Sequence, residues 1–157
     1  MGEQVRLTII GRQRDGSGEI NVTRTTAKGE YYYKNHSLYL LYRESADDDS
    51  AIIQSRIKYN NNRLELIRTG AVHTSMIFEC GKEHMTDYVT PYGCLRLGIL
   101  THSVEGALPP HAQSSMDNAA PAKNYENLII RAVYSLTAEG QTISDCEIEI
   151  SIVFERK

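Results

Sequence analysis

The segment from Cys146 to Phe154 alternates apolar and polar residues over almost its whole length, as Cys-Glu-Ile-Glu-Ile-Ser-Ile-Val-Phe. Because neighbouring side chains of a β-strand point to opposite faces, this pattern predicts a strand with one dry face. Similar runs recur from Gln4 onward, separated by Gly, Asn, Asp or Pro about every ten residues. Such spacing is typical of an antiparallel meander that closes into a barrel. We therefore expect an all-β, calycin-like barrel.

The 157 residues of the chain match one ordinary domain, so we expect a single β-barrel domain over residues 1–157. The alternation predicts about eight to ten antiparallel strands. Their expected cores are Val5–Ile9, Glu19–Ala27, Leu38–Glu44, Ile52–Tyr59, Arg63–Arg68, Thr74–Phe78, Met85–Thr90, Leu95–Thr101, Leu128–Leu136 and Cys146–Phe154. The turns Asn35-His36 and Ala138-Glu139-Gly140 separate neighbouring strands.

One segment lacks the alternating pattern of apolar and polar residues. Residues 107–124 form a loop insertion rich in proline, serine and alanine, which is unusual inside a compact domain. It is either a flap over a barrel mouth or an insertion without a role. A helical pattern between Met116 and Asn127 is interrupted by Pro121, so at most one turn of helix is expected there.

Composition excludes several classes of protein. The formal net charge is -3, and no stretch approaches the roughly 18 apolar residues that a membrane helix needs. The start of the chain lacks a secretory signal, so we expect a cytoplasmic protein without a membrane partner. The three cysteines, Cys80, Cys94 and Cys146, have no CxxC spacing, and we interpret them as reduced thiols that behave as small buried hydrophobic residues.

Charge patterning suggests how the barrel closes. If Val5 and Leu7 face inward, Arg6 faces solvent, and the same alternation turns Glu147 and Glu149 outward in the last strand. Side-by-side placement of the first and last strands then sets bases opposite acids, which contributes roughly 0.2 to 1 kcal/mol per pair. Solubility alone is the alternative explanation of these charges.

The same alternation gives a candidate site. Two expected strands each carry an apolar face that ends in a charge, Glu44 in residues 38–44 and Arg68 in residues 63–68. Buried charges are tolerated only when paired, so we expect Glu44 and Arg68 to meet inside the barrel or at its rim. The pair either fixes strand register or helps to bind a small amphipathic or apolar ligand, with Arg68 as anion anchor. The expected ligand-binding residues are Arg68, Glu44, Tyr42, Tyr88, Tyr134, Met76 and Phe78.

A set of short motifs, in this order along the chain, resembles the YwiB-like family of small bacterial proteins. The motifs are Leu41-Tyr42-Arg43-Glu44, Leu66-Ile67-Arg68-Thr69-Gly70, Met76-Ile77-Phe78, Tyr88-Val89-Thr90-Pro91-Tyr92-Gly93 and Thr101. The resemblance implies a calycin-type, lipocalin-like β-barrel in a bacterial cytoplasm and no established activity. It supplies no catalytic residues, and the insertion at 107–124 looks longer than the family's usual connection.

Other chemistry has weaker support. The five histidines lack metal-binding spacing, although Cys80 and His84 are close enough in sequence to supply two ligands. No phosphate-binding glycine motif occurs, and no nucleophile stands beside a base, so we expect no cofactor, metal or catalytic residue and lean against an enzyme.

Two alternatives to a ligand-binding barrel remain. A barrel filled by its own side chains, Met76, Phe78, Tyr134 and Phe154, would act as a protein-interaction module or homodimer. Binding of single-stranded nucleic acid is less expected, because the net charge is negative and alternate tyrosines of the triplet Tyr31-Tyr32-Tyr33 point into the core. The residues that favour it are Arg12, Arg14, Arg24, Lys28 and Lys34, beside Tyr31-Tyr32-Tyr33.

Overall fold

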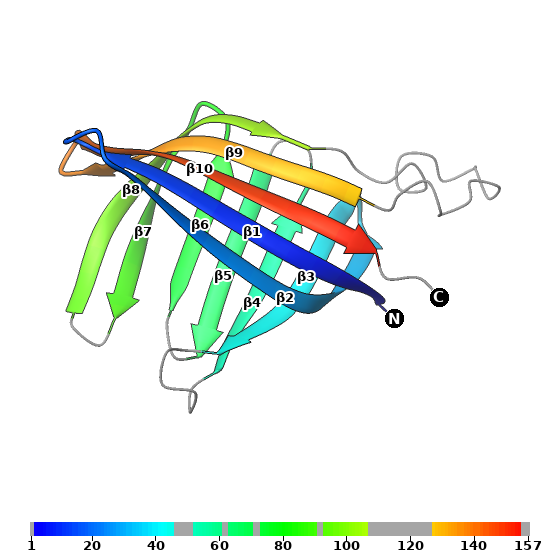
Figure 1. Ribbon diagram of the computed structural model, residues 1–157. Helices are drawn as coiled ribbons and strands as arrows, with labels where there is room; N and C mark the ends of the chain where they lie inside the picture. The colour runs from blue at the N-terminus through cyan, green and yellow to red at the C-terminus, as the bar shows by residue number, and fades with distance from the viewer. Residues whose placement is uncertain are drawn as a thin grey trace.

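Ten antiparallel strands form one sheet that curls into a nearly closed barrel (Figure 1). The computed structural model describes residues 2–45, 52–60, 63–70, 73–90, 93–106 and 127–154. The strands are β1 (Glu3–Asp15), β2 (Ile20–Lys34), β3 (Ser37–Ser45), β4 (Ile52–Tyr59), β5 (Arg63–Gly70), β6 (Thr74–Glu79), β7 (Glu83–Thr90), β8 (Gly93–Glu105), β9 (Asn127–Ala138) and β10 (Gln141–Phe154). The predicted all-β class and strand number are confirmed. The segment 107–124 lies outside the described residues.

Local sequence explains the tight turns. Asn35 and His36 both take positive φ, of 54° and 64°, and connect β2 to β3 in the two-residue turn that matches the twist of a hairpin. Glu139 and Gly140 do the same between β9 and β10, with φ of 52° and 81°. The tyrosine triplet continues β2 up to the first of these turns. Both turns therefore lie where the sequence predicts them.

The first and last strands lie side by side, as predicted. Val5 pairs with Phe154 and Ile9 with Ile150 along the β1–β10 ladder. On the outer face Arg12 lies 3.7 Å from both Glu147 and Glu149, and Arg131 of β9 lies 2.9 Å from Glu147. Bases therefore face acids across three neighbouring strands, as the charge pattern predicts, but Arg12 and Arg131 supply them, because Arg6 lies opposite Val153.

The barrel has a seam between β6 and β7. These strands are the two edges of the sheet. Because they follow each other in the chain, they would ordinarily be expected to pair as a hairpin. The turn between them is held by β8 instead, because the Gly81 amide donates to the Thr101 carbonyl and the Thr101 amide donates to the Lys82 carbonyl. Side chains bridge the seam: the Thr86 hydroxyl donates to the Ser75 carbonyl at 2.6 Å.

The two ends of the barrel interior differ. At the end that carries both chain termini, large side chains fill the space, and Tyr31 packs edge-on against Phe154 with ring centroids 4.9 Å apart. We call this the packed end. Its members are Val5, Tyr31, Leu38, Tyr59, Leu64, Phe78, Leu128 and Phe154, all buried. Phe78 also packs edge-on against Tyr134, with ring centroids 4.7 Å apart.

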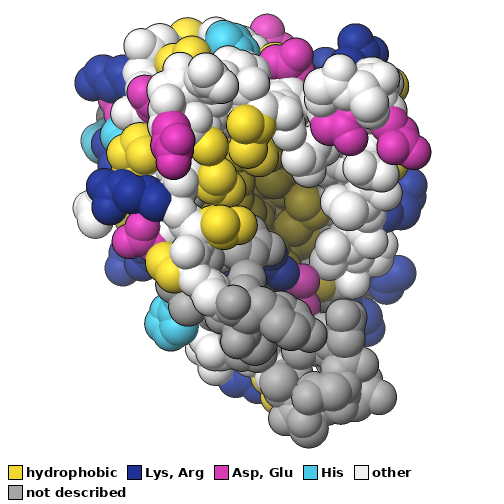
Figure 2. Space-filling model, turned by 90° about the vertical axis from the view of Figure 1, so that its left-hand side faces the viewer, with side chains coloured by type: hydrophobic (Ala, Val, Ile, Leu, Met, Phe, Trp, Pro, Cys, Tyr) yellow, Lys and Arg dark blue, Asp and Glu magenta, His cyan; other side chains and the backbone are white. Residues whose placement is uncertain are grey.

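The opposite end, which carries the β1–β2 and β9–β10 turns, is more exposed, and we call it the open end (Figure 1). Along the inner face of β8 the exposed fraction rises from 0% at Ile99 to 63% at Leu95. Figure 2 shows a hollow at this end, lined by hydrophobic side chains, with a basic and an acidic side chain at its lower edge. The barrel is therefore packed at one end and hollowed at the other.

Candidate functional site

The inner wall at the open end carries a cluster of polar side chains from four neighbouring strands. An Nη2 donor of Arg68 on β5 lies 3.1 Å from Oε1 of Glu44 on β3, so the predicted meeting of the two charges is confirmed. Ser55 of β4, which lies between these strands, donates from its hydroxyl to Oε2 of Glu44 at 3.2 Å. Arg68 and Glu44 side chains are 29% and 15% exposed, so the pair lies at the inner rim and not in bulk water.

Strand register explains why these residues meet. Ser55 pairs with Tyr42 of β3 on one side and with Arg68 of β5 on the other. Partners in adjacent strands of one face have Cβ atoms about 4.5 to 5.5 Å apart, within reach of side-chain hydrogen bonds. Thr74 of β6 pairs in turn with Arg68. The row Tyr42, Ser55, Arg68 and Thr74 is thus continuous across four strands.

Burial shifts the acidity of Tyr42. Removal of its hydroxyl from water, together with the nearby charge of Glu44, raises the pKa of Tyr42 to about 12, against the smaller opposing influence of Ser55 and Arg68. The phenol is therefore neutral and hydrogen-bonded to Ser55 at physiological pH. The cluster contains one acid and one base and carries no net charge.

Two polar atoms of this cluster lack a partner. Nε of Arg68 and the hydroxyl Oγ1 of Thr74 are both buried and form no hydrogen bond within the described part of the chain. Buried polar groups are nearly always paired, and an unpaired one costs about 1 to 3 kcal/mol. Since Arg68 and Thr74 are register partners, the two open positions lie side by side on the same wall.

The remaining predicted site residues lie elsewhere or lack description. Tyr134 and Phe78 pack on each other, and Met76 is half-buried between Thr74 and Phe78 on β6. The backbone of Tyr88 belongs to β7, but its side chain lies outside the described residues. Ser55 and Thr74 are not among the site residues predicted from the sequence. The signal was available, because each is a lone hydroxyl in an otherwise apolar inward row.

The thiols differ from the prediction. Cys146 is buried, and burial raises its pKa to about 11, so it stays protonated. Cys80 and Cys94 are exposed, and the expectation of buried hydrophobic behaviour is wrong for these two. Cys80 lies at the turn after β6, where it donates to the His102 carbonyl at 3.3 Å, and Cys94 lies at the start of β8, near a turn. Both occupy strand ends, where the barrel wall does not cover them.

Two arrangements on the outer wall contain groups used in catalysis. The Ser135 hydroxyl donates to Asp145 at 3.1 Å and lies 2.8 Å from Nε2 of His102. In nucleophilic triads the imidazole lies between the serine and the acid, whereas here the serine lies between the other two. Glu79 contacts His84 at 3.0 Å near the seam, outside the hollow. Among the described residues no group of three or more potential metal ligands gathers at one place.

Comparison with known proteins identifies the family. Residues 7–150 match the family described as "Domain of unknown function (DUF1934)". The chain belongs to this family. It is similar to the "Uncharacterized beta-barrel protein YwiB" of Bacillus subtilis (strain 168), with 31% identity over 94 residues, which are 60% of this chain. The matched region spans 63% of the length of that curated relative.

A solved structure supports the fold independently. The chain superposes on the crystal structure of the ywiB protein from Bacillus subtilis with a TM-score of 0.76 and 21% identity. The match covers 98% of this chain and 93% of that one. The predicted YwiB-like family and β-barrel fold are therefore confirmed. The described part of the chain contains no helix long and apolar enough to cross a membrane.

Proposed function

We propose that this barrel binds a small amphipathic or apolar molecule at its open end, in a bacterial cytoplasm. The ligand's polar group contacts Arg68 and Thr74, and its apolar part lies against the hydrophobic wall of the hollow. One observation carries the proposal: two buried polar atoms, Nε of Arg68 and Oγ1 of Thr74, lie on paired positions and have no hydrogen-bond partner among the described residues. A ligand atom that accepts from Nε and bonds to the hydroxyl removes both unpaired groups.

The charge of the cluster limits the chemistry of the ligand. Glu44 already neutralises Arg68, so a carboxylate ligand must compete with Glu44 for the guanidinium. A hydroxyl or carbonyl group meets no such competition, because Nε is an uncommitted donor. We therefore place a neutral hydrogen-bonding head group ahead of a carboxylate. The anion-anchor role of Arg68 stays a prediction, and Met76, Phe78 and Tyr134 are the proposed deeper walls.

A barrel that acts through its outer surface is the rival proposal. Several large hydrophobic side chains of the outer wall are exposed, among them Val22 at 60% and Ile129 at 50%, and these suit contact with a second copy of the chain. Under that proposal Glu44 and Arg68 only fix strand register, and a water molecule fills the two open hydrogen-bonding positions.

Native mass spectrometry of protein purified from its own cytoplasm tests both proposals, because it reads bound small molecules and oligomeric state together. A displacement titration then uses a fluorescent apolar probe, a medium-chain alcohol and the matching fatty acid. The alcohol is expected to bind more tightly than the acid. A spectrum of unliganded monomer together with no probe binding contradicts the ligand proposal.

A matched pair of threonines locates the site. Thr74→Val removes the unpartnered hydroxyl at nearly constant shape and is expected to weaken alcohol binding roughly three- to tenfold, the value of one hydrogen bond. Thr101→Val is the control, because Thr101 is equally buried and its hydroxyl also lacks a partner among the described residues, but it pairs with Tyr134 and not with Arg68. Equal losses in the two variants contradict the proposed location.

A further inference from the structure

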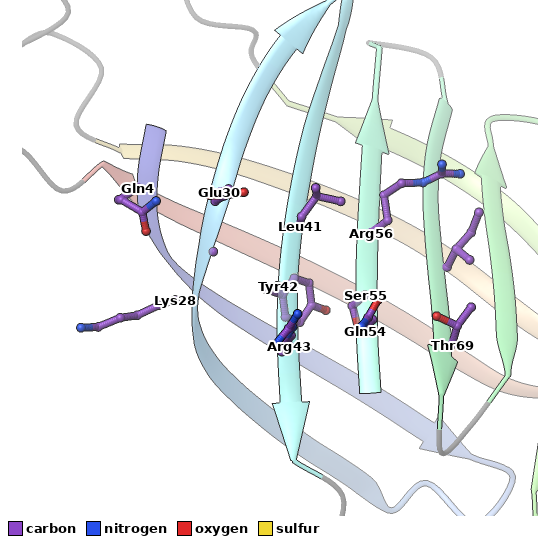
Figure 3. Close-up of a pocket in the computed structure, with 12 residues that line it drawn as sticks. Gln4, Lys28, Glu30, Leu41, Tyr42, Arg43, Gln54, Ser55, Arg56 and Thr69 are labelled. Atoms are coloured by element: carbon purple, nitrogen blue, oxygen red, sulfur yellow. The ribbon is translucent and has the colours of Figure 1, made fainter. Parts of the chain in front are cut away.

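The outer wall of the barrel carries a groove on the other side of the same strands. It has a volume of about 700 Å³ and runs over β1 to β5. Figure 3 shows its basic side chains, Lys28 on β2, Arg43 on β3 and Arg56 on β4. Leu41 and Ile67 are its apolar members. Its lining also includes Tyr42 and Ser55 of the inner cluster, so the groove and the hollow lie on the two sides of the same strands.

Two cations of this groove, Lys28 and Arg43, are neighbours in register, whereas Arg56 pairs with Leu41. Lys28 pairs with Arg6 of β1. It also lies across from Arg43, because the adjacent residues Gly29 and Tyr42 are partners. Like charges placed directly opposite each other destabilise a sheet. Lys28 and Arg43 therefore keep a costly arrangement, whereas β1, β10 and β9 set Arg12 and Arg131 against Glu147 and Glu149.

The three cations Lys28, Arg43 and Arg56 have no acidic partner within the described part of the chain. Outside the groove Arg12, Arg63, Lys82, Arg96 and Arg131 each have one, whereas Arg14, Arg24 and Lys34 have none among the described residues. The one acid that lines the groove, Glu30, accepts a hydrogen bond from the Tyr32 hydroxyl at 2.8 Å. The groove thus presents positive charge on a protein whose net charge is -3.

Aromatic rings border the groove. Tyr32 and Tyr39 are register partners, and both point outward because their neighbours Tyr31 and Leu38 are buried. The ammonium of Lys58 lies 5.7 Å from the centre of the Tyr39 ring. The half-exposed Leu41 lies between this ring row and the cations. Cations that follow a groove beside flat rings are the two components with which proteins bind single strands of nucleic acid.

We propose that this groove binds single-stranded nucleic acid. Its phosphates contact Lys28, Arg43 and Arg56, and its bases stack on the row of Tyr39 and Tyr32. An acidic peptide would use the same cations but has no planar groups that match the adjacent rings, so the rings decide between the two occupants. A bound phosphate chain also explains why this face keeps Lys28, Arg43 and Arg56 without an acidic partner among the described residues.

Fluorescence anisotropy with labelled oligothymidylate and oligouridylate, measured between about 50 and 200 mM salt, tests the proposal. If three phosphates are neutralised, the logarithm of the association constant falls with the logarithm of the salt concentration with a slope of about −2. Lys28→Gln or Arg43→Gln is expected to reduce the steepness by about 0.7 each. Arg131→Gln is the control, because it removes an exposed cation that is already paired with Glu147.

A ring variant separates nucleic acid from other polyanions. Tyr39→Leu is expected to weaken oligonucleotide binding roughly tenfold through lost stacking, with the salt slope unchanged. Heparin and an acidic peptide are the competing probes, and their binding should not depend on Tyr39. Thermal melting of each variant confirms that it is folded. Absence of oligonucleotide binding, an equal loss in Arg131→Gln, or insensitivity to Tyr39→Leu overturns the proposal.

Discussion

The packed end and the open end of the barrel are built from strands with the same alternation of side chains, but their inward residues differ in kind. At the packed end large apolar side chains fill the interior, and Tyr31, Phe78 and Phe154 are buried against one another or their neighbours. At the open end the inward rows finish in Glu44, Arg68 and Thr74, and two of their polar atoms have no partner in the described part of the chain. One end stabilises the fold, and the other keeps unsatisfied groups that a structural role does not require.

The largest expected difference between the ends is in stability. Phe78→Ala removes a fully buried ring that packs on Tyr134, and should lower the free energy of unfolding by about 3 to 5 kcal/mol. Met76→Ala on the same strand, where the side chain is only half-buried, should cost roughly half as much or less. Urea denaturation with both variants measures the ratio. Equal costs would mean that the hollow at the open end is filled as tightly as the packed end.

The sequence predicts which face each residue takes better than it predicts depth. Alternation alone puts Glu44 and Arg68 on one inner wall, and the ion pair confirms it. Alternation also predicts that Phe78 and Tyr134 face inward. It does not predict that the two rings pack on each other in the core, because that depends on how far along the barrel each residue lies. Depth depends on register across several strands, which a single sequence does not supply.

Long-range hydrogen bonds explain the other departures. The spacing of β6 and β7 favours a paired hairpin, but Thr101 of β8 binds the connecting turn and leaves a seam between the two strands. Likewise, Ser55 and Thr74 gain their importance only because β4 and β6 flank Arg68. Residues with no unusual local pattern can therefore complete a site whose charged members are easy to predict.

The second, smaller effect is the pH dependence of stability that Tyr42 of the open end contributes. Burial raises the pKa of Tyr42 to about 12 in the folded state, whereas an unfolded tyrosine titrates near 10. The unfolded state therefore loses its proton first, and the stability that Tyr42 contributes is complete below pH 10 and is lost as the pH rises toward 12. The loss reaches at most about 3 kcal/mol.

Stability curves of the wild type and Tyr42→Phe between about pH 8 and 12 isolate this contribution, since the other buried tyrosines titrate in both proteins. The variant should show the shallower decline. Absorbance of the phenolate near the same pH range checks the assignment. Parallel curves would mean that solvent reaches the Tyr42 hydroxyl through the open end, and that the wall beside Ser55 is wetter than its burial indicates.

The smallest expected effect is the difference in coupling energy between one ion pair of the inner wall and one of the outer wall. A double-mutant cycle of Glu44→Gln and Arg68→Met should give a coupling energy of about 1 to 2 kcal/mol, reduced from the value for fully buried pairs because Arg68 is 29% exposed. Arg131 and Glu147, which are 46% and 29% exposed, should give under about 1 kcal/mol in the same cycle. Salt should weaken the outer coupling more than the inner one.

The cycle also separates the structural from the binding interpretation of the inner pair. If Glu44 and Arg68 only fix register, the double variant loses stability and leaves alcohol binding at the open end unchanged. If Arg68 contributes its Nε to a ligand, Arg68→Met weakens alcohol binding in both the wild-type and the Glu44→Gln backgrounds. Glu44→Gln alone frees Nη2 of Arg68, and it therefore strengthens binding of the fatty acid relative to the alcohol. An inner coupling no larger than the outer one would show that the rim is fully solvated.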